Sequence, residues 1–131
     1  MGLYNFMPQF VPKIRSGEKR HTIRGDRRYP DKPGDMMHLY CGLRTRSVEL
    51  IMRVPCVRVE RIKIDCTPGG EPTNIAIEGV WLSRSEREAL ARCDGFDSFA
   101  DMMKFWNGRL PFHGHIYHWK FEPSAERKVA A

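Results

Sequence analysis

Lys19 and Thr22 place an amine and a hydroxyl three positions apart near the start of the chain. Amide hydrolysis needs a nucleophile, a base and a group that stabilises the oxyanion, and an amine beside a hydroxyl can supply the first two. A free lysine has a pKa near ~10.4, so Lys19 needs burial or nearby cations before it acts as a base at neutral pH. Arg20 lies between the two residues and Arg24 follows them, and both can help to lower that pKa. Residues three apart on a strand point to opposite faces, so a turn or bulge must bring Lys19 and Thr22 together.

The segment 13–32 concentrates the positive charge of the chain. It carries eight Lys or Arg residues against three acids, a net charge of +5, whereas the whole chain is +6. Arginine is always charged, and its planar guanidinium fits phosphate well. We therefore consider Arg20, Arg24, Arg27 and Arg28 as candidate nucleic-acid-binding residues, with 24–28 as a phosphate-contacting loop. The alternative is that this loop is an ordinary solvated turn.

The composition is typical of a globular protein of one domain. Of its 131 residues 41% are hydrophobic and 29% are charged, and a sequence pI near 9.4 favours an anionic partner. No apolar run approaches the roughly 20 residues that cross a bilayer, and the N-terminus lacks the features of a signal peptide. Cys41, Cys56, Cys66 and Cys93 form no C-x-x-C pair, which favours reduced thiols over disulfides. We expect a cytoplasmic protein with no membrane association; nothing in the pattern defines an oligomeric state.

The hydrophobic pattern predicts a helix, several strands, two further helices and a last strand. Phe10, Val11 and Ile14 have helical spacing, and Gly17 suits the position after the helix end. Alternation predicts strands at 20–24, 37–41, 48–54, from 57 onward and near 75–77, with a turn at 30–35, a bulge or strand end at Pro55 and a loop at 67–73. Capping residues Ser83 and Ser98 predict the two helices, and the last strand is expected at 115–121. This order fits an α+β domain with a strongly curved sheet or small barrel.

The segment 10–24, with its helix, Gly17, Lys19, Thr22 and Arg24, resembles the ASCH domain, a branch of the PUA-like superfamily. Later pieces agree in order: Pro33-Gly34-Asp35 before Leu39-Tyr40, Asp94-Gly95-Phe96 between the two helices, and Gly114 to Trp119 as the last strand. The resemblance implies one ASCH domain over 1–121, a PUA-like small curved β-barrel flanked by helices with a cleft at the Lys–Thr–Arg strand. The segment 122–131 lacks apolar periodicity, and we expect it to be a flexible tail.

The resemblance also implies two functions. Some small ASCH proteins are amidohydrolases that remove the acetyl group of N4-acetylcytidine with a Lys, a Thr and a Glu. By motif position these residues correspond to Lys19, Thr22 and Asp94, so an Asp stands where those enzymes have a Glu. A carboxylate that is one methylene shorter can be misplaced, and about 1 Å of misplacement can cost roughly 10²-fold in rate. In this reading Thr22 attacks, Lys19 takes its proton, and Asp94 orients Lys19 or binds the amino edge of the base.

PUA-like domains commonly bind RNA, so the alternative is a non-catalytic RNA- or DNA-binding module with a basic cleft. The expected partner is therefore RNA, single-stranded DNA or a modified cytidine nucleoside. A third possibility is structural: Lys19 and Asp94 form a partly buried ion pair, and Thr22 is an ordinary strand residue.

Two other groups of residues allow a functional and a structural interpretation. His113, His115 and His118 suggest a metal, but on a strand His118 would face away from the other two, so we expect no metal and no cofactor. The second group is aromatic and comprises Tyr117, Trp119 and Phe121. These rings can either stack on bases or pack in the core beneath a half-buried strand, and we expect them to be core residues. We expect the same of Met102, Met103 and Trp106.

Overall fold

The computed structural model describes residues 2–66 and 73–121. The elements in chain order are β1 (Gly2–Phe6), the 3-10 turn η1 (Pro8–Phe10), α1 (Val11–Ser16), β2 (His21–Gly25), β3 (Met36–Cys41), β4 (Glu49–Cys66), β5 (Thr73–Ile77), β6 (Val80–Trp81), α2 (Arg84–Cys93), α3 (Phe99–Trp106) and β7 (Phe112–Trp119). The loop expected at 67–73 lies outside the described residues except for Thr73, and so does the tail expected at 122–131.

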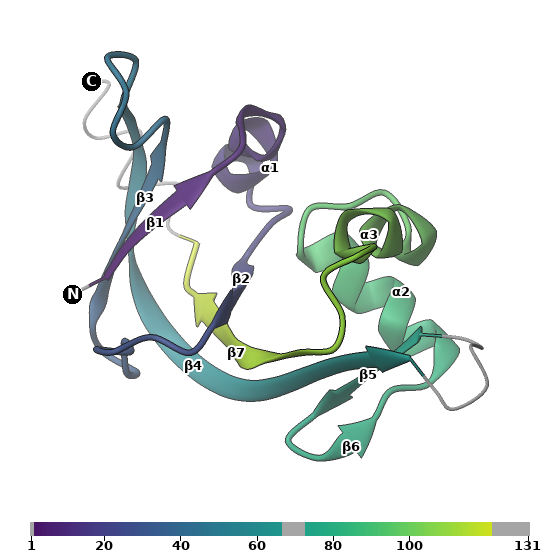
Figure 1. Ribbon diagram of the computed structural model, residues 1–131. Coiled ribbons are helices and arrows are strands. Elements are labelled where there is room, and N and C mark those ends of the chain that lie inside the picture. The colour runs from purple at the N-terminus through teal and green to yellow at the C-terminus, as the bar shows by residue number, and fades with distance from the viewer. Residues whose placement is uncertain (1, 67–72, 122–131) are drawn as a thin grey trace.

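The long strand β4 organises a curled mixed sheet. Its first part pairs with β3, its middle with β7 and its end with β5, while β7 also pairs with β2. All of these pairs are antiparallel, whereas β1 joins the edge at β3 in parallel. Figure 1 shows β4 bending so that the sheet closes halfway into a barrel, with α1 near the end of β1 and α2 and α3 above β5. This arrangement confirms the expected α+β domain with a strongly curved sheet, which forms a half-barrel.

Pro55 does not end a strand, because β4 continues through it as 18 residues. The pairing of β4 with β7 is irregular between Cys56 and Arg58, so the expected bulge lies just after the proline. Pro55 itself pairs with Met36 and accepts a hydrogen bond from the backbone of Lys120. A proline is tolerated beside a bulge because the ladder is already interrupted there.

β1 was not expected from the sequence. Its side chains alternate, with Tyr4 and Phe6 buried and Leu3 exposed, but the strand has only five residues and follows directly on the N-terminus. The parallel pairing with β3 is what makes it a strand, and a single short segment does not reveal such a long-range partner. The strand β6 was also missed, because two residues are too few to show an alternation, although its partner β5 is the neighbouring strand.

The predicted helix ends agree with the structure. Gly17 ends α1 in the left-handed conformation with φ of 86°. Ser83 caps α2 in a full capping box with Glu86, and the Ser98 side chain accepts the backbone N–H of Asp101 at the start of α3. Such caps satisfy backbone donors that the first turn of a helix leaves unpaired.

The last strand begins earlier and ends earlier than predicted. β7 runs over Phe112–Trp119, because its partner β2 pairs with it from Gly25–Gly114 to His21–His118. Phe121 therefore lies outside the strand, and its ring packs over Gly17 instead. The strand prediction of 115–121 was wrong at both ends for this reason: pairing with β2 and β4, not hydrophobic alternation alone, sets the boundaries.

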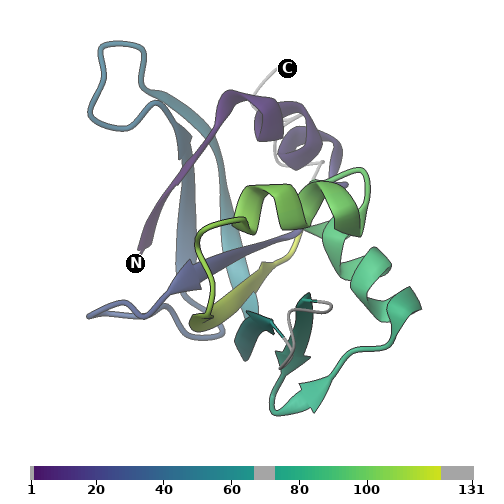
Figure 2. The same cartoon turned by 45° about the vertical axis from the view of Figure 1, so that its right-hand side comes forward.

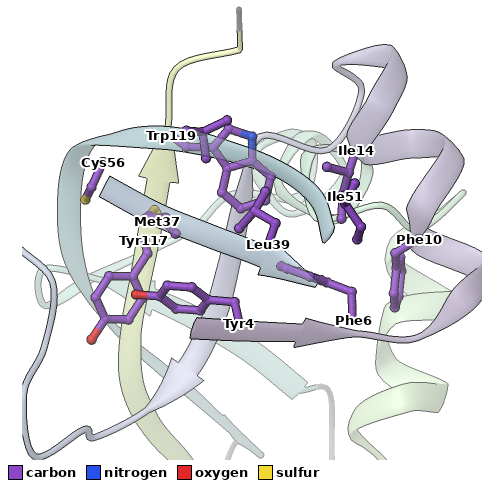
Figure 3. Packing of buried hydrophobic residues seen from close by; sticks show 11 residues of the cluster. Tyr4, Phe6, Phe10, Ile14, Met37, Leu39, Ile51, Cys56, Tyr117 and Trp119 are labelled. Atoms are coloured by element: carbon purple, nitrogen blue, oxygen red, sulfur yellow. The ribbon is translucent and has the colours of Figure 1, made fainter. Parts of the chain in front are cut away.

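Two clusters form the core. The first joins β1, β3, β4 and β7. Figure 3 shows Tyr4 beside Tyr117, with ring centroids 5.6 Å apart, and the ring of Trp119 meets that of Phe6 edge to face at 6.1 Å. The second fills the space between the sheet and the helices α2 and α3 and includes Met102 and Trp106. The core prediction is therefore confirmed for four side chains that are each at most 6% exposed: Tyr117 and Trp119 of β7 and Met102 and Trp106 of α3. Met103 is half-buried and packs against the second cluster.

Two further observations concern thiols and membranes. Cys41, Cys56 and Cys93 are free thiols, as expected for the part of the chain that is described. No helix within residues 2–66 and 73–121 has the length and apolarity that crossing a bilayer requires.

Candidate functional site

A pocket of about 430 Å³ opens where β1, β2 and the link between α2 and α3 approach one another. In Figure 1, β2 runs between the half of the sheet that holds β1 and β3 and the two helices α2 and α3. Figure 2 shows α3 lying over β2 and β7, which it covers through the second core cluster. Six aromatic side chains form much of the pocket wall, namely Phe6, Phe10, Phe96, Phe105, Trp106 and Phe112. Lys19, Thr22, Arg24 and Asp94 supply its main polar groups, with Arg109 and Asn5 also on the wall.

Lys19 and Asp94 form a buried ion pair on this wall. Nζ of Lys19 lies 3.0 Å from Oδ1 of Asp94 and also donates to the backbone carbonyl of Asp94. Both residues are buried, with 3% and 6% of their surfaces exposed. Asp94 is the C-cap of α2, and the backbone N–H of Arg20 donates to the carbonyl of Cys93, so the end of α2 is joined to the chain just before β2.

Lys19 and Thr22 converge because Lys19 precedes the strand. β2 begins at His21, so the alternation of side chains along a strand applies to Thr22 but not to Lys19. The left-handed Gly17 turns the chain there, and the backbone N–H of Lys19 donates to the carbonyl of Lys13. This is the turn that the chemistry required, and both side chains line the same pocket.

Burial lowers the pKa of the Lys19 ammonium from its ordinary value, and although Asp94 opposes this shift, the cations of Arg24 and Lys13 add to it. Arg24 thus contributes as expected, while Lys13 contributes in place of Arg20. The ammonium also lies 5.0 Å from the ring centre of Phe10, which partly replaces lost hydration. A lysine in this setting releases its proton closer to neutral pH than a free lysine does.

Burial by itself would raise the pKa of the Asp94 carboxyl, but the Lys19 ammonium and the His21 imidazole outweigh it, so the pKa lies below its ordinary value. Nε2 of His21 is 3.3 Å from Oδ1 of Asp94, and His21 is itself 3% exposed. Sequence reasoning missed His21. Its position between Lys19 and Thr22 was the available signal, but a histidine within a strand is not by itself diagnostic of a site.

Arg24 contacts the hydroxyl of Thr22. Its Nε donates to Oγ1 of Thr22 at 2.9 Å, and its terminal nitrogen donates to the carbonyl of Asn5 at 2.7 Å. Burial, followed by the charge of Arg27, lowers the pKa of Arg24, but the guanidinium stays charged at any physiological pH. A guanidinium that donates to a hydroxyl oxygen stabilises the alkoxide form of that hydroxyl.

The other candidate arginines point elsewhere. Arg20 donates through Nε to the carbonyl of Gly17 and lines a separate groove behind β2. Arg27 donates to the carbonyl of Leu3, and the exposed Arg28 stacks on the Tyr29 ring. The structure therefore brings only Arg24 of the four into the pocket, and it adds Arg109, which the sequence did not single out.

The histidines of β7 do not gather around one point. His118 lies 2.8 Å from Oε1 of Glu60, and His115 lies 3.4 Å from Oδ1 of Asp26. Among the described residues no group of three or more His, Cys, Asp or Glu side chains is arranged to hold a metal ion.

The chain matches no family model, no curated protein and no solved structure. The functional argument therefore depends on the site itself. That site combines a buried amine of lowered pKa, an ionised carboxylate that holds it, and a hydroxyl that accepts a hydrogen bond from a guanidinium. These are the groups that transfer of an acyl group to a hydroxyl requires.

Proposed function

We propose that this chain is an ASCH-type protein of the PUA-like fold that hydrolyses the amide of an N4-acylated cytosine, with N4-acetylcytidine as the probe substrate. The observation that carries the proposal is that Lys19 and Thr22 line the same pocket, with Asp94 buried against Lys19. The resemblance in the Lys–Thr–Arg segment supplies the substrate class, and the geometry supplies the roles.

Thr22 is the nucleophile in this mechanism. The neutral amine of Lys19 takes the hydroxyl proton while Oγ1 of Thr22 bonds to the acyl carbon. Arg24, which already donates to Oγ1, stabilises the negative charge on Oγ1 as its proton leaves. The carbon–nitrogen bond then breaks, and the Lys19 ammonium gives its proton to the N4 amine of the departing cytosine.

A water molecule completes the cycle. Lys19, neutral again, takes a proton from the water, whose oxygen bonds to the acyl carbon of the Thr22 ester. The ester bond breaks, the proton returns to Oγ1 of Thr22, and the acyl group leaves as a carboxylic acid that ionises in solution. The sum is one amide and one water converted into cytidine and a carboxylate.

The shorter carboxylate of Asp94 does not stop it from reaching Lys19. The distance of 3.0 Å between Nζ and Oδ1 is that of a direct charged hydrogen bond. The backbone carbonyl of Asp94 accepts a second hydrogen bond from the same ammonium, so the C-cap of α2 holds Nζ by two oxygens. This supports a role for Asp94 as the residue that orients Lys19.

The size and lining of the pocket also support a nucleoside. Small-molecule sites are commonly clefts of roughly 300–1,000 Å³ lined by apolar and aromatic side chains with a few fixed polar groups, and this pocket of about 430 Å³ has that composition. Phenylalanine rings on the wall can stack on a flat base, as aromatic side chains do with single-stranded nucleic acids.

The test is incubation of the purified protein with N4-acetylcytidine and chromatographic detection of cytidine and acetate. Turnover that is lost in Thr22→Ala but kept in a surface control, Ser85→Ala in the first turn of α2, is the expected result. The absence of turnover in the wild-type protein contradicts the proposal.

The second candidate is a non-catalytic module that binds RNA or single-stranded DNA. Arg28 and Arg109 favour it, because both are exposed, and Arg109 is stacked on Phe105 at the pocket wall. A binding module would retain N4-acetylcytidine or oligonucleotide unchanged. Tight, salt-sensitive binding of RNA without cytidine release would therefore favour this candidate over the hydrolase.

A further inference from the structure

His21 lies behind the Lys19–Asp94 pair, on the face of β2 away from Thr22. Successive residues of a strand point to opposite faces, so Thr22 lines the pocket while His21 lines the groove on the other side of the strand. The His21 side chain is 3% exposed. Neither of the two candidate functions uses this residue.

The only acceptor within ion-pair distance of Nε2 of His21, in the part of the chain that is described, is Oδ1 of Asp94 at 3.3 Å. That nitrogen is buried and makes no conventional hydrogen bond to any described residue. A buried N–H without an acceptor destabilises the folded protein, so the contact with Oδ1 of Asp94 is what offsets this cost for Nε2 of His21. Oδ1 of Asp94 is thus shared by His21 and Lys19.

A second histidine holds the first. The ring of His118 on β7 meets the ring of His21 edge to face with centroids 5.3 Å apart, as their pairing in the two strands requires. Nε2 of His118 lies 2.8 Å from Oε1 of Glu60 on β4. A row of polar side chains therefore runs from Lys19 and Asp94 at the pocket, through His21 and His118, to Glu60 on β4.

We infer that His21 is a positioning residue for Asp94, which it holds from the face of β2 opposite the pocket, and that the His118–Glu60 pair fixes the ring of His21 in turn. This inference rests on the proposed function only in that Asp94 there orients the base Lys19. It assigns His21 a proton on Nε2 that is directed at Oδ1 of Asp94.

Charge sharing gives the inference a measurable consequence. The charged or titratable groups around His21 are Lys19 and Arg20 just before β2, Glu86, Cys93 and Asp94 on α2 and at its end, His118 on β7, and Glu60 and Arg58 on β4. An N–H directed at Oδ1 takes part of the carboxylate charge, so Asp94 attracts the Lys19 proton less strongly. Without His21, Asp94 holds that proton more tightly, and Lys19 becomes neutral only at higher pH.

The variant His21→Phe removes the donor and keeps a ring, while His21→Gln keeps a donor. The control is His38→Phe, on β3, where the histidine accepts from Arg53 and lies outside the pocket. The measurements are the NMR titration of the Lys19 ammonium without substrate, and kcat and KM for N4-acetylcytidine. We expect His21→Phe to raise the Lys19 pKa by about half a unit or more. The fraction of Lys19 that is neutral at pH 7 then falls in proportion, so kcat at neutral pH should fall at least ~3-fold while KM changes little. His21→Gln should restore most of both values, and His38→Phe should change neither.

Three outcomes decide the matter. An unshifted Lys19 titration in His21→Phe overturns the inference. If His21→Phe does not fold, nitrogen chemical shifts of the wild-type imidazole decide instead: a proton on Nε2 supports the inference, and a proton on Nδ1 alone overturns it. If the Lys19 titration shifts but the wild-type protein releases no cytidine, His21 positions Asp94 as inferred while the proposed hydrolase function fails.

Discussion

Nζ of Lys19 lies 3.0 Å from Oδ1 of Asp94, although the two residues are 75 positions apart in the chain. The contact forms because the C-terminal end of α2 meets the chain just before β2, where the N–H of Arg20 donates to the carbonyl of Cys93. The motif that begins at Lys19 is thus completed by a helix end from the other half of the chain.

Replacement of the Thr22 hydroxyl tests the nucleophile. Thr22→Ala should reduce hydrolysis of N4-acetylcytidine by roughly 10³-fold or more, because the acyl group then has no oxygen to accept it. Thr22→Ser keeps a hydroxyl and should keep part of the activity. Steady-state rates and thermal melts of both variants give the answer, and full activity in Thr22→Ala with an intact fold excludes Thr22 as the nucleophile.

The pH dependence tests the base. Lys19 must be neutral to take a proton, so kcat/KM should rise with pH and level off above the pKa of Lys19, which burial and then Arg24 and Lys13 place below that of a free lysine. Lys19→Met should remove this rise along with the activity. A rate that rises only through the region of an ordinary lysine, near pH ~10.4, would contradict the lowered pKa.

Asp94→Glu tests the departure from the enzymes that this chain resembles. Because Oδ1 already contacts Nζ and the site is 6% exposed, an added methylene must displace its neighbours. We expect a loss of about 1–3 kcal/mol in the free energy of unfolding, as for other overpacked sites, and slower turnover. Faster turnover on N4-acetylcytidine would show instead that the short side chain limits the wild-type rate.

Asp94→Asn tests the ion pair through acid stability. The pKa of Asp94 is lowered in the folded protein, so its stabilising effect is present above the unfolded value of ~3.9 and is lost as the pH falls through the folded value. At neutral pH Asp94→Asn should cost about 3–5 kcal/mol, since Lys19 is left buried without a counter-charge. Denaturant unfolding from pH 7 to pH 2 should show the difference between wild type and variant shrinking at low pH; a constant difference would argue against the ion pair.

Gly95 links the fold to the site. Its φ is 98°, and a Cβ atom there would lie 2.8 Å from the Phe10 ring and 3.1 Å from Cδ of Lys19. Gly95→Ala should therefore lower both stability and turnover. Gly79→Ala is the matched control, because Gly79 has a φ of 80° but no neighbour within 4 Å, so it adds the backbone strain alone. Equal loss of activity in the two variants would disprove the specific displacement of Lys19.

Salt dependence tests the nucleic-acid alternative. If the basic segment contacts phosphates, log affinity for RNA should fall linearly with log salt concentration, and Arg28→Glu should weaken binding to all sequences. Arg28 suits this test better than Arg27, which also holds the carbonyl of Leu3 and stacks on Tyr4, so that its loss affects the fold. Binding that is equal at low and high salt would exclude the basic segment as the contact surface.

Local signals in the sequence were sufficient for much of the secondary structure. Gly17 after α1, the capping box of Ser83 and the cap of Ser98 each act within a few residues, so the sequence predicts these helix ends correctly. The same holds for the alternating strand β3. Residue types and the resemblance to the ASCH domain also single out Lys19, Thr22 and Asp94 as candidates, and their role in a site stays a prediction.

Only the tertiary structure decided which of these residues meet. β1 became a strand through parallel pairing with β3, and β7 took its ends from pairing with β2 and β4, partners that lie far away in the chain. The same packing brought His21 against Asp94 and directed Arg20 away from the pocket. Residue types and short-range spacing determine which chemistry is possible, whereas the direction of each side chain depends on where a strand begins and on what packs against it, and those depend on contacts between distant segments.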